Sequence, residues 1–255
     1  MSQRRRISAE MSGAARAFLR RRTAVFFTFF FPVIIVVIFG VLIQTQPTDG
    51  GLFAEPPGWY LPGYLAVVVL FTPLSRVGSE VARHRDGNRF EKLATTPLSR
   101  AEWLLAHTIV NVGVIGIAGL LLLGLLIAGT NASIAVSAET ALVVPFVVLG
   151  VALFCGVGAL LGSFADSQDG VIAASNSIAL PLLFLSETFV TPELLPAWLP
   201  TELSPLTYFA RGVRAVTYSP AESGGGLGGP EYLAVVAVLA IVAFGAGAWA
   251  LPRTD

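Results

Sequence analysis

The 255-residue sequence is poor in charged residues, which make up 13% of it, while hydrophobic residues make up 55% and the mean hydropathy is +0.75. Soluble domains carry about twice that share of charge. A chain of this composition has too little polar surface to cover an exterior that faces water, so we expect an integral membrane protein. The formal net charge of zero also excludes an electrostatic nucleic-acid binder, which needs a basic face.

The residues of most catalytic and metal sites are also scarce. The single cysteine, Cys155, lies in an apolar run and forms neither an intramolecular disulfide nor a thiolate metal cluster. The two histidines, His84 and His107, do not have the spacing of a HExxH zinc site. The single lysine, Lys92, follows no glycine-rich loop, so there is no P-loop to cradle phosphates. We therefore expect no catalytic residue, no metal and no cofactor in this chain.

Six apolar stretches come near the length of about 20 residues that crosses a bilayer as a helix. They run approximately over Ala24–Ile43, Tyr60–Ser75, Leu104–Gly129, Leu142–Phe164, Val171–Ser186 and Tyr232–Leu251. Pro181 lies inside the fifth, where neighbouring membrane helices can satisfy the freed carbonyl. The sequence therefore predicts an all-α membrane protein with six transmembrane helices in one domain, 1–255.

The basic residues predict the orientation. If the N-terminus is cytoplasmic, fourteen of the sixteen Lys and Arg residues lie on the inner side, and only Arg211 and Arg214 lie outside. Positive residues near span ends stay in the cytoplasm, so we expect both termini there and the chain in the cell membrane. The arginine-rich segment 1–23 is then a cytoplasmic amphipathic leader against the headgroups.

The inner connection 76–103 mixes charges with apolar residues such as Phe90 and Leu93 at roughly helical spacing. We expect a helix on each side of a break at Gly87 or Pro97, with an amphipathic face that docks on a partner. A backbone with φ > 0 at Gly87 would explain the glycine there. A solvated charge run without a partner is the alternative interpretation of this segment.

The outer connection 187–230 alternates prolines with aromatic and aliphatic residues and ends in a glycine-rich linker. We expect two short re-entrant helices within Leu194–Val213, separated at Pro200 or Pro205, because broken backbone at membrane depth must be covered by protein or water. Trp198 would then lie at headgroup depth.

Few polar residues lie inside the predicted spans. Asn111 and Asn176 can either hydrogen-bond between helices or contact a solute, and Glu187 is either an interface residue or part of an outer mouth. With Arg211 from the outer segment, these residues form a candidate translocation path. No chain of intramembrane acids is present to relay protons, which argues against an ion-coupled transporter.

Three stretches resemble the permease subunit of the type-2 ABC exporters. They are GNRFEKLATTPLSRAE at 87–102, PELLPAWLP at 192–200 and LSPLTYFARGVR at 203–214, and the layout of leader, six spans, inner loop and broken outer segment is also similar to that family. One departure is that Arg83, His84, Arg85 and Asp86 stand where family members often carry Glu-Arg-Glu.

The resemblance implies a transporter subunit that is not itself an enzyme and that pairs with a second permease subunit as a homodimer or heterodimer. A separate P-loop ATPase would bind ATP and Mg²⁺ and power export of a lipid-like, amphipathic or drug-like solute. The residues expected at the ATPase-coupling interface are Glu80, Arg83, Arg85, Gly87, Arg89, Glu91, Thr96 and Pro97. An ion-coupled secondary transporter and a membrane scaffold without transport remain alternatives.

Overall fold

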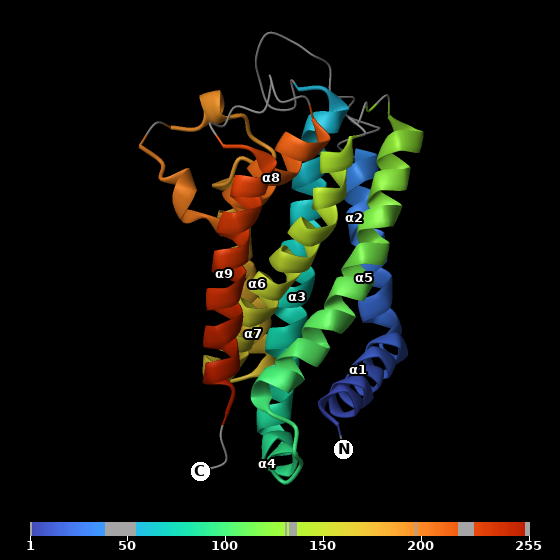
Figure 1. Cartoon of the computed structure of the whole chain (residues 1–255), viewed down its shortest axis with the longest axis vertical. Coiled ribbons are helices and arrows are strands. Elements are labelled where there is room, and N and C mark those ends of the chain that lie inside the picture. The colour runs from blue at the N-terminus through green and yellow to red at the C-terminus, as the bar shows by residue number, and fades with distance from the viewer. Residues whose placement is uncertain are drawn as a thin grey trace.

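The computed structural model describes residues 2–38, 55–130, 132, 137–196, 198–218 and 227–252. All regular structure within these ranges is helical, which confirms the all-α prediction (Figure 1). The elements are α1 (Gln3–Arg20), α2 (Arg22–Val36), η2 (Pro57–Tyr60), α3 (Leu61–Asp86), α4 (Arg89–Ala94), α5 (Arg100–Gly129), η3 (Ala138–Leu142), α6 (Val143–Phe164), α7 (Gln168–Phe184), η4 (Pro192–Leu194), η5 (Thr201–Leu203), α8 (Pro205–Thr217) and α9 (Gly229–Ala250).

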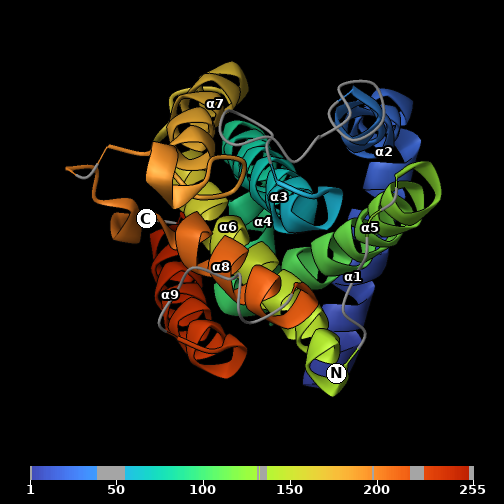
Figure 2. The same ribbon diagram turned by 90° about the horizontal axis from the view of Figure 1, so that it is seen from above.

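The long helices stand side by side, and the short ones close the two ends of the bundle. α4, the start of α1 and the end of α9 lie together at one end, which we call the α4 end (Figure 1). α8 and η2 lie at the opposite α8 end. α3 is the central helix, because 72% of its apolar stretch is buried inside the chain against 17% for α9. Viewed from above, α5 and α7 lie on opposite sides of α3 (Figure 2).

Four of the predicted spans correspond to helices that are long and apolar enough to cross a membrane. They are Pro57–Asp86, Arg100–Gly129, Ala138–Phe164 and Gly229–Ala250. The predicted first span corresponds to α2, which has 15 residues, and its expected end beyond residue 38 lies outside the described residues. The predicted fifth span corresponds to α7, which has 17 residues. Six spans therefore stay a prediction.

At glycine positions, α6 packs so closely against α3 and α9 that the helix backbones are in contact. A Cβ added to Gly156 on α6 would collide with the backbone carbonyl of Ala243 on α9, and a Cβ on Gly162 would collide with that of Gly78 on α3. Small residues allow membrane helices to approach in this way. α6 is therefore held between α3 and α9 by backbone contact.

The two connections agree with their predictions only in part. The predicted break at Gly87 is present, with a helix on each side, but the helix before it is a continuation of α3 past the predicted span end at Ser75, so only 87–99 forms the inner turn. Within the described part of the outer segment, α8 is the one α-helix, and it begins at Pro205, one of the two predicted break points, while η4 and η5 are single 3₁₀ turns. One of the two expected short helices is therefore present, and 3₁₀ turns replace the other. The prolines interrupt any longer helix before Pro205, where a proline at the first helical position is tolerated.

Candidate functional site

The turn between α3 and α5 carries most of the residues predicted to couple to an ATPase. α3 ends at Gly87, whose φ is −93°, so the expected positive φ at this glycine was wrong. The left-handed residue is Asn88, with φ 51°. Asparagine adopts this conformation more readily than most residues because its side chain can hydrogen-bond locally. The Gly-Asn pair thus reverses the chain into α4.

α4 has one buried side chain and a charged outer surface. Phe90 is buried, with its ring centroid 5.5 Å from that of Trp103 on α5 and 5.6 Å from that of His84 on α3. Most other residues of this turn point into solvent. The exposed predicted coupling residues are Gly87, Arg89, Glu91, Thr96 and Pro97, and Lys92 and Thr95 are exposed beside them. α4 is therefore anchored by one aromatic side chain and leaves its charges unburied.

The other predicted coupling residues, Glu80, Arg83 and Arg85, are half-buried in the last turns of α3. Arg85 donates to the carbonyls of Ser163 and Ala165, which lie at the end of α6. These carbonyls have no partner within their own helix end, so Arg85 caps α6. The structure thus divides the predicted set into an exposed group on the turn and a half-buried group on α3.

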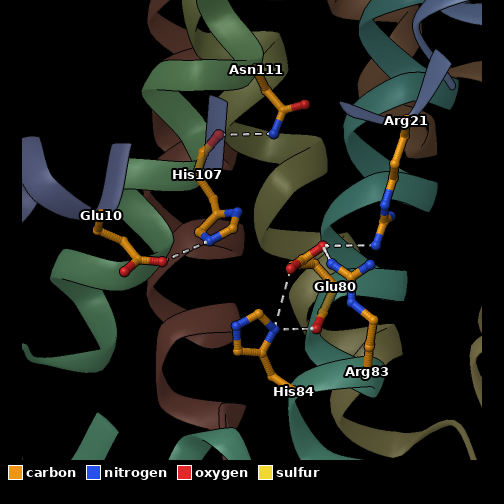
Figure 3. Close-up of polar contacts among 7 residues, drawn as sticks. All are labelled: Glu10, Arg21, Glu80, Arg83, His84, His107 and Asn111. Carbon is orange, nitrogen blue, oxygen red and sulfur yellow. Dashed lines mark hydrogen bonds and ion pairs between the residues drawn. The ribbon is translucent and has the colours of Figure 1, made fainter. Parts of the chain in front are cut away.

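Glu80 is the centre of a polar cluster on α3 (Figure 3). Its carboxylate pairs with Arg83, and Nη2 of Arg21, at the junction of α1 and α2, lies 3.9 Å from it. Nδ1 of His84 lies 2.8 Å from the Glu80 carbonyl oxygen. The charge of Glu80 is therefore compensated within this chain.

The leader α1 is bound to the bundle by contacts that the sequence analysis missed. Arg6 donates to Glu102 of α5 at 2.7 Å, and Glu10 lies 3.3 Å from Nε2 of His107 (Figure 3). The hydrogen bond with His107 is the main cause that holds the pKa of Glu10 below its usual range. The available signal was that Glu10 is the one acid in an otherwise basic leader.

The start of α5 joins three elements. Ser99 and Glu102 form a capping box, in which the Ser99 hydroxyl accepts from the Glu102 amide and the Glu102 carboxylate accepts from the Ser99 amide. Arg100 donates to the carbonyls of Trp249 and Leu251 at 2.9 and 2.6 Å. The first turn of α5 therefore contacts α1 through Glu102 and the end of α9 through Arg100.

The four residues of the predicted translocation path do not gather in one place. Asn111 is fully buried, where its amide oxygen accepts from Arg76 of α3 at 3.2 Å and its amide nitrogen donates to the His107 carbonyl. This arrangement is the interhelical hydrogen bonding that was one of its two interpretations. Asn176 is exposed on α7, and α7 lies across the bundle from α5, the helix that carries Asn111 (Figure 2).

Glu187 and Arg211 form an ion pair at the α8 end, in which Glu187 is buried and Arg211 is half-buried. Nε of Arg211 donates to the Glu187 carboxylate at 2.7 Å, and Glu187 is only 3% exposed. Next to this pair, Arg214 donates to the Glu187 carbonyl, and its guanidinium lies 3.7 Å from the ring centroid of Trp59. The two basic residues that the charge rule placed outside are therefore both held by partners within the chain.

No three His, Cys, Asp or Glu side chains in the described ranges gather as metal ligands would.

Comparison with known proteins shows to which family the chain is related. The family described as ABC-2 type transporter matches residues 7–218, which include every helix from α2 to α8. A daunorubicin resistance ABC transporter permease protein, DrrB1 of Streptomyces coeruleorubidus, is 27% identical over 179 residues, covering 68% of this chain and 62% of the relative. The chain therefore belongs to the ABC-2 type transporter family.

Proposed function

We propose that this chain is the membrane-spanning subunit of an ATP-driven exporter, with six spans, both termini and the α4 end in the cytoplasm, and a separate P-loop ATPase docked on α4. The observation that carries the proposal is the exposure of Arg89, Glu91 and Lys92 on a short helix whose Phe90 is anchored in the bundle. A charged, unburied face on a fixed base is suited to bind a partner with complementary charges.

The connections of α4 give a route for mechanical coupling. Movement of α4 acts directly on α3 and α5, and the first turn of α5 contacts α1 through Glu102 and α9 through Arg100. A shift driven by closure of the ATPase would therefore move these helices as a group, which is a rigid-body switch biased by the binding energy of a partner. The ATPase would bind ATP and Mg²⁺, while this chain would convert their effect into helix movement.

The exposed face of α7 supports pairing with a second permease subunit. Asn176 and Ser177 lie on this face, although α7 is apolar overall. A polar amide facing hydrocarbon is costly, so in the membrane this face would contact a second subunit or line the solute path. The solute would be lipid-like, amphipathic or drug-like, a class that includes daunorubicin, the compound after which the relative DrrB1 is called a resistance protein.

Docking is tested by co-expressing the tagged chain with the ATPase encoded beside it and measuring the ATPase retained on purification. Arg89→Glu places like charge across the interface and should weaken retention about ten- to hundredfold. Arg85→Glu is less informative, because Arg85 also caps α6. Arg16→Glu is the matched control, since Arg16 is an exposed arginine on α1 that lies outside the α4 turn.

The outcomes separate the alternatives. Equal retention by Arg89→Glu and Arg16→Glu would remove α4 from the interface. A wild-type chain that retains no ATPase would favour the scaffold interpretation, and solute flux that follows an imposed ion gradient without ATPase would establish a secondary transporter.

A further inference from the structure

A cavity of about 360 Å³ lies within this chain between α3, α5 and α6, toward the α8 end. Its volume falls in the range of small-molecule sites. α5 leans away from α3 as it approaches the α8 end (Figure 1), and Gly116 and Gly119 of α5 face the cavity without side chains. A Cβ added to Gly116 would meet nothing within 4 Å. The surface of α5 that faces the cavity therefore has no side chain at Gly116, and open space lies next to it.

The lining is apolar except at one end. Among the described residues, none that lines the cavity is charged, and the two polar ones are Thr140, in η3, and Thr217, at the end of α8. The remaining lining residues are Leu61, Leu65, Val112, Ile115, Gly116, Gly119, Leu120, Leu123, Val143, Val144, Val147 and Val148. A charged group would lose its hydration here without gaining a partner, so the cavity excludes ions.

The two hydroxyls set the polarity of the end that they line. Thr217 donates its hydroxyl proton to the carbonyl of Val213 at 2.7 Å, and Thr140 donates to the carbonyl of Val216 at 3.1 Å. A hydroxyl that has used its proton has only lone pairs to offer. The amide of Ser137 already donates to Thr140, which leaves Thr217 as the better acceptor for a group inside the cavity.

We propose that this cavity binds an uncharged, mostly apolar solute that carries one hydrogen-bond donor, such as a hydroxyl, at the end that meets Thr217. The statement that the protein exports this solute rests on the function proposed above. A phospholipid headgroup does not fit, because no cation among the described lining residues is there to receive a phosphate.

The probe for this proposal is para-hydroxymethyl benzophenone, which is uncharged, apolar and photoreactive and has one hydroxyl donor. The full chain in phosphatidylcholine nanodiscs would be irradiated with the probe, and the labelled peptides mapped by mass spectrometry. We expect label on the part of α5 around Gly116 and on the start of α6. The methyl ether of the probe, which cannot donate, should label these peptides about fivefold less, the effect of one lost hydrogen bond.

The test variant is Gly116→Leu, which fills the cavity, and the control is Gly113→Leu. Both glycines lie on α5 with nothing within 4 Å of an added Cβ, but Gly113 is exposed and does not line the cavity. Gly116→Leu should lose the label, and Gly113→Leu should keep it. Thr217→Val should remove the difference between the alcohol and its ether.

Equal labelling of the two leucine variants, or label spread over the outer faces of the helices, would overturn the proposal. Label that appears in detergent but not in nanodiscs would mean that a lipid chain occupies the cavity and would also overturn it. The readout needs no ATPase. A chain that labels as expected but retains no ATPase would refute the proposed function and keep the site, while the opposite pattern would refute the site alone.

Discussion

The two ends of this bundle both concentrate charge, but they use it in opposite ways. At the α8 end, Glu187 and Arg214 are buried and Arg211 is half-buried, and their polar groups satisfy one another or nearby carbonyls. At the α4 end, Arg89, Glu91 and Lys92 lie on the surface of a six-residue helix and remain exposed. The first arrangement is closed within one chain, and the second is open to another molecule.

The difference shows that charge density alone does not identify a binding surface. Burying a charge is costly unless it is paired, so a buried ion pair fixes the geometry of the segment that contains it. An exposed charge contributes little to folding, which leaves the charges of α4 available for the docking proposed above. The comparison predicts that substitutions at the α8 end affect stability and substitutions at the α4 end affect association.

The largest expected effect is the loss of the buried pair. Glu187→Ala leaves the Arg211 guanidinium without its main partner, and breaking a buried pair in this way costs about 3–5 kcal/mol. Thermal unfolding of the purified chain in one fixed detergent would measure the loss. Glu202→Ala is the control, because Glu202 lies 3.8 Å from Arg211 but is mostly exposed, and exposed pairs contribute about 0–1 kcal/mol.

A double variant makes this prediction stricter. Arg211→Met in the Glu187→Ala background removes the orphaned charge, so the double variant should be more stable than Glu187→Ala alone. If the second substitution adds a further loss, the two side chains act separately and the α8 end is not held by a closed pair.

The sequence predicted the helical class, four of the spans and the position of the inner turn, because these follow from long apolar runs and from Gly and Pro. It predicted a helix that ends at Gly87, but not that this helix is continuous with the second span as α3. Glu80 and Arg83 look like charges outside a span in the sequence, and only their pairing in three dimensions makes them compatible with a continuous packed helix. The docking of α1 through Glu10 and Arg6 was also hidden, because its partners His107 and Glu102 lie about a hundred residues away.

A smaller effect is expected at the first turn of α5. Ser99→Ala removes one half of the capping box and should cost about 1 kcal/mol. Ser177→Ala is the control, since the exposed Ser177 hydroxyl donates only to the Ala173 carbonyl within its own helix. Thermal unfolding of both variants tests this prediction. An equal effect of the two substitutions would mean that the junction with α1 and α9 does not depend on the cap.

The attachment of α1 should depend weakly on pH. The pKa of Glu10 is lowered in the folded chain by its hydrogen bond with His107, so its contribution is present above the unfolded pKa of about 4.3 and is lost as pH falls through the lower folded value. A spin label at position 16 in a Cys155→Ala background should gain mobility as the pH falls through this range. Glu10→Gln should abolish the pH dependence. A transition that persists in Glu10→Gln would assign it to another group.

The smallest expected change in stability is at Arg89, and it bears most directly on the comparison. Arg89 is exposed and forms no ion pair with any residue in the described ranges. Exposed substitutions of this kind change stability by about 0.5 kcal/mol or less, so Arg89→Glu should unfold at nearly the wild-type temperature. The same protein should nevertheless retain far less ATPase, because the proposed interface places the reversed charge against the partner and not against this chain. If Arg89→Glu lowers stability as much as Glu187→Ala does, the charges of α4 hold the fold together, and the contrast between a closed end and an open end is wrong.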